Sequence, residues 1–136
     1  MSGATLRPAG EAPGRADGSR SRALYYDILA EGRLVGRCEL RPEVTPATRL
    51  YGQAAFTVFP AERGHHYAAQ ALRLLLREGQ LLGLDALTLT CRPENTASRR
   101  TIGLAGGALR EIAEVPEGHP LRLSGITRVC VYELRR

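Results

Sequence analysis

Residues 63–68 combine residue types that suit a short segment to binding an anion. They read Arg-Gly-His-His-Tyr-Ala and lie between a strand-like run at 53–60 and a helical run at 68–82. The first turn of a helix leaves backbone N–H groups without partners and carries partial positive charge, so phosphate groups commonly bind there. Arg63 adds a permanent cation. The segment therefore predicts a phosphate site, and the simpler alternative is a surface turn that caps a helix.

A second segment, residues 95–98, has the composition of a helix start. It reads Asn-Thr-Ala-Ser and follows an apolar run rich in Thr. Asn is a favoured N-cap residue, because its side chain accepts a hydrogen bond from the first turn. Gly106 begins a glycine pair that can end the helix. We therefore predict a short helix over 96–104 with Asn95 at its start.

Together these segments resemble the acyl-CoA signature of the GNAT superfamily of N-acetyltransferases. Its first motif runs Arg or Gln, two free positions, Gly, one free position, and then Gly or Ala. In this chain Arg63 is the first residue and Ala68 the last, while His66 stands where the family usually has Gly. Asn95 and the helix after it resemble the family's second motif. The resemblance spans roughly residues 51–107.

The resemblance implies that acetyl-CoA is the co-substrate. In the family, the backbone of the third strand pairs with the amide groups of pantetheine, so the strand beginning near Leu84 has to splay away. Phe56 and Val58 would equally suit the core of an ordinary half-buried strand. The Cβ of His66 restricts the backbone where Gly could approach a phosphate closely. The residues implied to bind CoA are Phe56, Thr57, Val58, Arg63, Gly64, His65, His66, Tyr67, Ala68 and Asn95.

The sequence leaves the catalytic residues unassigned. Acetyl transfer to an amine needs a base that deprotonates the amine and an acid that protonates the leaving thiolate. The resemblance places a Tyr where this chain has Ile102, and a carboxylate near residues 51–53, where it has none. Holding the reactants together can drive the reaction without either group. The candidate substitutes, for each of which a structural role is the simpler reading, are Glu39, Tyr51, Ser98, Cys91 and His119.

Composition and charge exclude several other classes of protein. The 19 basic residues are all Arg and the net charge is +5, which suits an anionic ligand. Aromatic residues do not interleave with Arg in the way that favours base stacking, so we do not expect nucleic-acid binding. His65 and His66 are adjacent and have no evident third partner, so we expect no metal site.

The location of the protein follows from its cysteines and its hydropathy. No apolar run approaches the roughly 20 residues that span a bilayer, and residues 1–22 contain no secretory signal. Cys38, Cys91 and Cys130 lie far apart, and their odd number favours free thiols. We therefore expect a protein of the reducing cytoplasm, without a membrane partner.

Periodicity predicts an α/β (α+β) fold. A helix between two strand-like runs favours a central parallel pair, and the other strands are expected to be antiparallel, with flanking helices. This mixed, mostly antiparallel sheet also resembles the GNAT core. Strands are expected at 25–29, 33–40, 51–59, 84–91, 108–115 and 126–134, and helices at 68–82 and 96–104.

Residues 1–22 are rich in Gly, Ala, Pro, Ser and Arg, which predicts a flexible tail before a single GNAT-like domain at 23–136. The resemblance implies a first strand and two helices ahead of the first hairpin, where the helices wall the acceptor site. Only the polar segment occupies that place here. We therefore expect an acceptor groove that is either open or completed by a second copy in a homodimer.

Three hypotheses follow. The first is an N-acetyltransferase that moves an acetyl group from acetyl-CoA to a primary amine by direct attack, the acceptor being unknown. The alternative is a CoA-binding, catalytically inactive domain that acts as a sensor or assembly partner, which the missing Tyr and carboxylate favour. The third is a small basic interaction module that binds no CoA.

Overall fold

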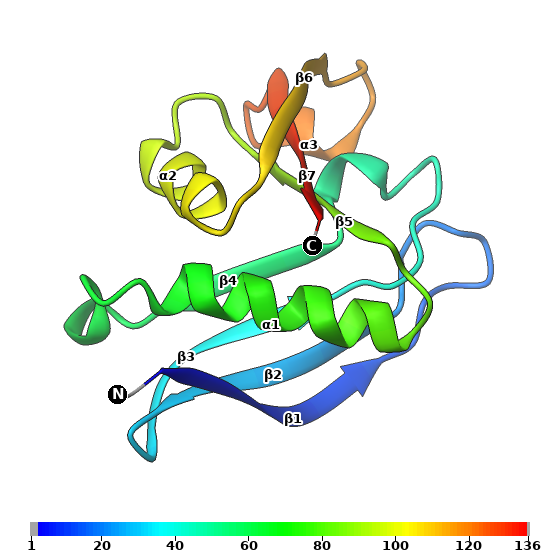
Figure 1. Cartoon of the computed structure of the whole chain (residues 1–136). Coiled ribbons are helices and arrows are strands. Elements are labelled where there is room, and N and C mark those ends of the chain that lie inside the picture. Colours follow the sequence, from blue (N-terminus) through cyan, green and yellow to red (C-terminus); the bar gives the residue numbers. More distant parts are fainter. Residues whose placement is uncertain (1–2, 136) are drawn as a thin grey trace.

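The computed structural model describes residues 3–135, and over this range the strands form two antiparallel sheets. The first sheet has the order β1-β2-β3-β4 and the second the order β5-β7-β6. Figure 1 shows α1 lying along the first sheet and α2 beside the second. The strands are β1 (Ala4–Ala12), β2 (Ala23–Ala30), β3 (Arg33–Leu40), β4 (Ala54–Val58), β5 (Ala86–Cys91), β6 (Ala108–Glu114) and β7 (Arg128–Arg135). The helices are α1 (Tyr67–Leu81), α2 (Thr96–Leu104) and the short α3 (Pro120–Leu123), with 3-10 turns at Arg49–Tyr51 and Pro60–Glu62.

The β2–β3 hairpin forms as its sequence predicts. Glu31 and Gly32 both have positive φ, 52° and 74°, which matches the twist of a tight hairpin turn. The pairing runs from Leu24 opposite Leu40 to Ala30 opposite Arg33. Alternate residues of β2 are buried, which gives this sheet one apolar face.

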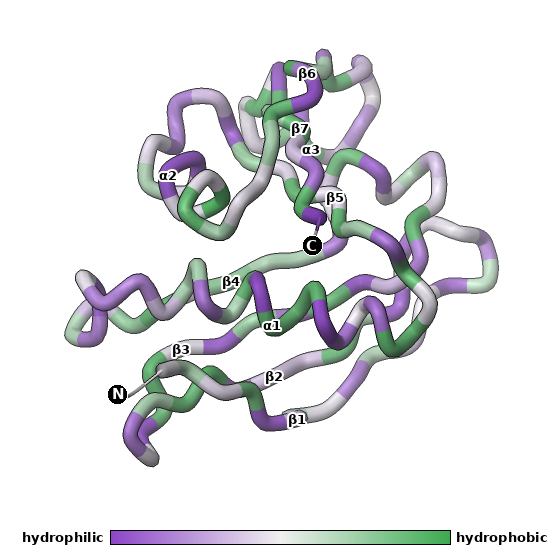
Figure 2. The backbone as a smooth tube through the Cα atoms, viewed as in Figure 1, coloured by the Kyte–Doolittle hydropathy of each residue, from purple (hydrophilic) through white to green (hydrophobic). Residues whose placement is uncertain are grey.

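The apolar stripe of α1 covers that face. Ala71, Leu72 and Leu75 are fully buried, and they form one core cluster with Ile28 of β2 and Leu40 of β3. Hydrophobic and hydrophilic residues alternate along α1, as expected of a helix with one buried side (Figure 2). The helix is therefore held against the sheet by burial of apolar surface, and its N-terminal end is fixed relative to β4.

The two sheets separate between β4, at the edge of the first sheet, and β5, at the edge of the second. The N–H of Gln53 donates to the carbonyl of Thr88 at 2.7 Å, and the Gln53 side chain accepts from the N–H of Thr88 at 2.9 Å. Beyond this point the two strands belong to different sheets. The α+β fold with mostly antiparallel strands is confirmed. The expected central parallel pair does not form one continuous sheet, because β4 and β5 belong to different sheets and meet only at the Gln53–Thr88 end. This separation is the opening that the resemblance implied.

The prediction of a flexible tail is wrong for residues 4–12, which form β1. This strand pairs with β2 from Ala4 opposite Ala30 to Ala12 opposite Ala23. An edge strand needs few apolar residues, because backbone hydrogen bonds satisfy one side and solvent the other. Ala4 and Leu6 suffice to pack it against the core. Met1 and Ser2 lie outside the described residues.

The first strand of the family is therefore present, and residues 13–22 connect it to β2 without the two helices that the resemblance implied. Smaller differences concern the ends of elements: residues 49–51 form a 3-10 turn rather than the start of a strand, and α3 lies in the predicted last loop. None of the helices described within 3–135 has the length and apolar character needed to cross a bilayer.

Candidate cofactor site

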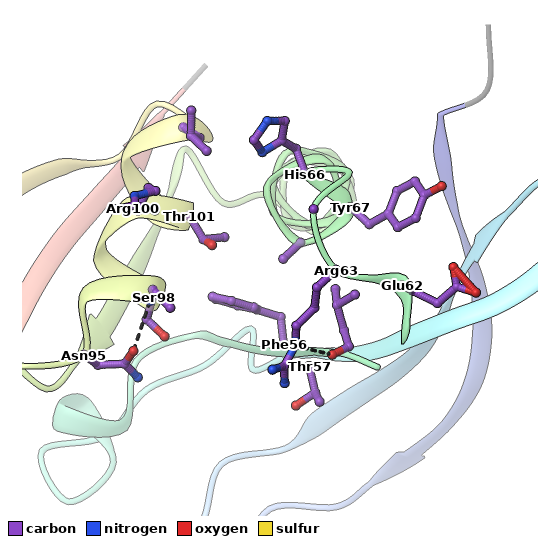
Figure 3. Close-up of a pocket in the computed structure, with 15 residues that line it drawn as sticks. Phe56, Thr57, Glu62, Arg63, His66, Tyr67, Asn95, Ser98, Arg100 and Thr101 are labelled. Carbon is purple, nitrogen blue, oxygen red and sulfur yellow. Dashed lines mark hydrogen bonds between the residues drawn. The ribbon is translucent and has the colours of Figure 1, made fainter. Parts of the chain in front are cut away.

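A cleft of about 590 Å³ lies between β4, the start of α1 and one side of α2. Figure 3 shows the labelled residues of α2 facing those of β4 and of the 63–67 turn across this cleft. The cleft brings together nine of the ten residues predicted to bind CoA, and His65 is the exception. Those nine are Phe56, Thr57, Val58, Arg63, Gly64, His66, Tyr67, Ala68 and Asn95.

His65 lies outside the lining because its ring turns toward the helix. The imidazole stacks on Tyr67 with ring centroids 5.2 Å apart, and its backbone carbonyl accepts from the side chain of Gln70 at 3.3 Å. This residue therefore stabilises the start of α1 from the outside, and only its backbone belongs to the turn.

The turn has the conformation that exposes backbone N–H groups. Gly64 and His66 both have positive φ, 94° and 62°. His66 is the N-cap of α1 and makes no side-chain cap, so the first N–H groups of the helix are not capped by this residue. The Gly that the family signature usually carries here thus has a physical reason, since this position requires the left-handed region.

Arg63 is folded over the edge of β4. Its Nε donates to the carbonyl of Val58 at 3.3 Å, and Figure 3 shows the side chain running down toward Thr57. Among the described residues, no hydrogen bond engages its two terminal nitrogens. The guanidinium is therefore positioned at the cleft and keeps donors for an anion.

Asn95 caps α2 as predicted. Its Oδ1 accepts from the N–H of Ser98 at 3.1 Å, while its side chain also lines the cleft. The N-cap role and the lining role therefore coexist.

The sequence prediction missed most of the α2 side of the cleft, together with Glu62. On α2 the spacing of three or four residues was the available signal, because such residues share a helix face. Arg100 brings a second exposed cation to the cleft. The missed lining residues are Glu62, Ala97, Arg100, Thr101 and Leu104, while Ser98 was predicted only as a candidate catalytic residue.

The negative charge of Glu62 is balanced from outside the cleft. Arg33 hydrogen-bonds this carboxylate at 2.8 Å, which holds the pKa of Glu62 below its usual range. The group is therefore charged at neutral pH but already paired. Arg63 and Arg100 are left to set the electrostatic character of the cleft toward an anionic ligand.

Comparison with known families identifies the fold. The family described as the acetyltransferase (GNAT) domain matches residues 6–107. This chain belongs to the GNAT acetyltransferase family. A comparison with curated protein sequences finds no significant match.

Solved structures of GNAT proteins share the fold at low sequence identity. Mycobacterium smegmatis RimJ in complex with CoA-disulfide is 20% identical with a TM-score of 0.63, over 83% of this chain and 53% of that one. Salmonella typhimurium yncA, a putative acetyltransferase with its cofactor acetyl-CoA, is 16% identical with a TM-score of 0.61, over 83% and 64%. A Salmonella typhimurium acetyl transferase that modifies the N-terminal serine of a 50S ribosomal subunit protein is 17% identical with a TM-score of 0.62, over 84% and 64%. The chain spans less than two thirds of the length of these neighbours.

The GNAT fold separates the five candidate catalytic residues. Ser98 lines the cleft, whereas Glu39 and Tyr51 line a second depression. His119 packs against Tyr51 with ring centroids 5.4 Å apart. Burial raises the pKa of the Cys91 thiol to about 11, so it stays protonated at neutral pH. The structure therefore does not gather these residues around one point.

The His119 ring is fixed by its own loop. Its Nδ1 accepts from the N–H of Leu121 at 3.1 Å, which places the proton of the neutral ring on Nε2. That Nε2 is buried, and no partner for it lies among the described residues. Within residues 3–135, no group of three or more His, Cys, Asp and Glu side chains is arranged to hold a metal ion.

Proposed function

We propose that this chain is an N-acetyltransferase that moves the acetyl group of acetyl-CoA to a primary amine. The observation that carries the proposal is the 63–67 turn, where positive-φ residues and Arg63 meet the start of α1 beside the opened edge of β4. This junction suits a pyrophosphate, and the strand edge suits the amide groups of pantetheine. Family membership and the ligands named in the neighbours RimJ and yncA support the same reading.

The acetyl-CoA would lie with its pyrophosphate on the N–H groups at the start of α1, with Arg63 and Arg100 as the nearby cations. Its pantetheine would follow β4 from Val58 toward Phe56. The strands converge at Gln53, so the thioester would come to rest near Phe56. This placement leaves the carbonyl carbon close to the joined end of the two sheets.

We propose direct transfer without an acyl-enzyme. The neutral amine attacks the acetyl carbonyl carbon, the carbon–sulfur bond breaks, and the CoA thiolate leaves and takes up a proton, while the amine nitrogen releases one. Burial raises the pKa of the Cys38 thiol to about 12 and that of Cys91 to about 11. Neither is a thiolate at neutral pH, and the chain has no Lys.

Two measurements test the proposal. Calorimetric titration of the protein with acetyl-CoA should give one saturable site. Release of free CoA thiol should then depend on an added primary amine. Absence of acetyl-CoA binding would remove the CoA-based reading altogether and leave the small basic interaction module.

One observation favours a second candidate, a CoA-binding domain without turnover. Ile102 is 1% exposed and part of the main core, so no side chain there can serve as the acid that the resemblance implied. Saturable acetyl-CoA binding with no thiol release across a panel of amines would select this candidate.

We further propose that the protein acts in the cytoplasm as a homodimer. The support for the second copy is β6, an edge strand on which Leu109 and Ile112 are 44% and 46% exposed. Exposed apolar side chains on an unpaired strand edge favour self-association.

A further inference from the structure

A second depression, of about 400 Å³, lies on the opposite face of the first sheet from α1. Tyr25 and Glu39 are paired across β2 and β3 and belong to its lining. Their neighbours Tyr26 and Cys38 point the other way, into the core under α1. Because successive side chains alternate between faces, this depression opens on the side that α1 leaves uncovered.

We propose that this depression is the acceptor site, and that it takes a primary amine as its ammonium form with Glu39 as the anionic partner. The inference rests on the proposed function, since an acceptor site has meaning only if an acyl group is transferred. The chemical class is a primary ammonium whose remainder is neutral or anionic, such as the N-terminus of an acidic peptide.

The location follows from strand register. Glu39 of β3 is opposite Ala55 of β4, and the next residue, Phe56, lines the cofactor cleft. Directly opposed residues of antiparallel strands have Cα atoms about 4.5–5.5 Å apart. Thr57, which shares the Glu39 face, also lines the cleft. Glu39 is therefore one register position from Phe56, near which the thioester is proposed to stop, and its side chain is on the face of the sheet that Thr57 shares.

The chemistry of the lining suits one ammonium group. Oε2 of Glu39 accepts from Arg41 at 3.1 Å, and no hydrogen bond to Oε1 occurs among the described residues. The Glu39 side chain is 25% exposed, so Oε1 can be reached by a ligand. Tyr25 and Tyr51 supply aromatic surface in the same depression, and ring faces attract cations.

Arg41 holds the arrangement in place. It donates from Nε to the carbonyl of Gly52 and from a terminal nitrogen to the carbonyl of Tyr51, both at 3.0 Å. The Arg41 guanidinium therefore hydrogen-bonds both the Glu39 carboxylate and the backbone of residues 51 and 52, just before β4. Arg20 lines the depression as well, so two guanidinium groups stand beside one carboxylate. That balance disfavours polyamines and favours an acceptor that carries negative charge next to its amine.

The lining of the depression includes two buried polar side chains. The hydroxyls of Ser21 and Thr48 are buried and hydrogen-bonded to each other at 2.8 Å. Ser21 belongs to the 13–22 connection, which joins β1 to β2 without a helix. The connection thus shapes a shallow site that a peptide end can enter without displacing a covering helix.

The test is a binding measurement that needs no turnover. The protein, saturated with CoA, is titrated by calorimetry with a short acidic peptide that has a free N-terminus, and with the same peptide N-acetylated. We expect the free peptide to bind roughly tenfold or more tightly, since it alone can form the charge-assisted bond to Glu39. Glu39→Gln should abolish this difference, whereas Glu43→Gln, on the neighbouring exposed loop, should retain it.

Equal binding of the two peptides, or a difference that survives in Glu39→Gln, would overturn the inference. Tyr25→Leu provides a second route if Glu39→Gln lowers the melting temperature, and it should weaken the free peptide selectively. A failure of the proposed function gives a different result: the unmodified protein would then not bind acetyl-CoA, or would not release the CoA thiol when an amine is added.

Discussion

His66 has φ 62° and ψ 25°, a left-handed backbone conformation that is uncommon for every residue except Gly, although Asn, Asp and His adopt it more often than the rest. The left-handed region costs a residue with a Cβ about 1–2 kcal/mol. His66→Gly should remove this cost, although Gly loses about 0.5–1 kcal/mol through its greater freedom in the unfolded chain. We expect a net gain of up to about 1 kcal/mol in the free energy of unfolding.

Urea denaturation measures this gain, and His66→Val is the matched control, because a β-branched residue is strongly disfavoured at positive φ. The same variants also test how the 63–67 turn contributes to the affinity for acetyl-CoA. His66→Gly should bind acetyl-CoA at least as tightly as the unmodified protein. A loss of affinity in His66→Gly would mean that the imidazole itself, and not the backbone of the turn, contacts the ligand.

Arg63 should contribute directly to the affinity for acetyl-CoA. Loss of one charge-assisted contact typically costs about 1.5–3 kcal/mol, so Arg63→Ala should weaken binding roughly tenfold to hundredfold. Calorimetry measures the dissociation constant, and circular dichroism checks that the fold is intact. Arg77→Ala, an exposed position of α1 away from the cleft, is the control. An unchanged constant in Arg63→Ala would remove the turn from the proposed site.

At the scale of elements, the joined end of β4 and β5 depends on Gln53. Its side chain is buried and accepts the N–H of Thr88, and its other end donates to the carbonyl of Pro42. Gln53→Ala would leave a backbone donor unsatisfied, which costs about 1–3 kcal/mol. We expect a lower free energy of unfolding and weaker acetyl-CoA binding together, because the opening of the strands is set here. Gln80→Ala on α1 should change neither quantity.

β1 should be required for stability, contrary to the expectation from composition. It pairs with β2 along its whole length, and the N–H of Ala4 donates to the Gln70 side chain of α1 at 2.7 Å. A chain that begins at Ala23 should therefore melt at a clearly lower temperature and associate through the exposed edge of β2. A melting temperature within a degree or two of the full chain would show that this pairing contributes little.

Periodicity alone predicted most of the elements, because α1, α2 and the β2–β3 hairpin each bury a regular apolar face. It missed β1, whose pairing is made by backbone groups that leave no pattern in a polar sequence. The separation of β4 from β5 was likewise invisible in the residues and came only from the family resemblance. Arg100 was missed for a different reason. In the sequence, a single Arg on a helix is interpreted as a solvent-exposed side chain, and only the fold shows that it lines the same cleft as the 63–67 turn.

At the scale of the whole molecule, the two outer edges of the described sheets differ in character. In the first sheet, β1 covers the edge of β2 and β4 covers the edge of β3. The edge at β1 contains Pro8 and a register shift beside it, features that discourage pairing with another strand. The edge at β6 exposes Leu109 and Ile112. Self-association is therefore expected through β6.

Multi-angle light scattering over a concentration series tests this contact. We expect the mass of two chains at micromolar concentration, and Ile112→Lys should restore the mass of one, because a charge on the edge opposes pairing. Leu81→Lys is the matched control: Leu81 is 82% exposed at the far end of α1, so this change should leave the dimer intact. A single-chain mass for the unmodified protein at high micromolar concentration would contradict the dimer. The depression at Glu39 would then have to receive its acceptor as an open groove on a monomer, without a second copy beside it.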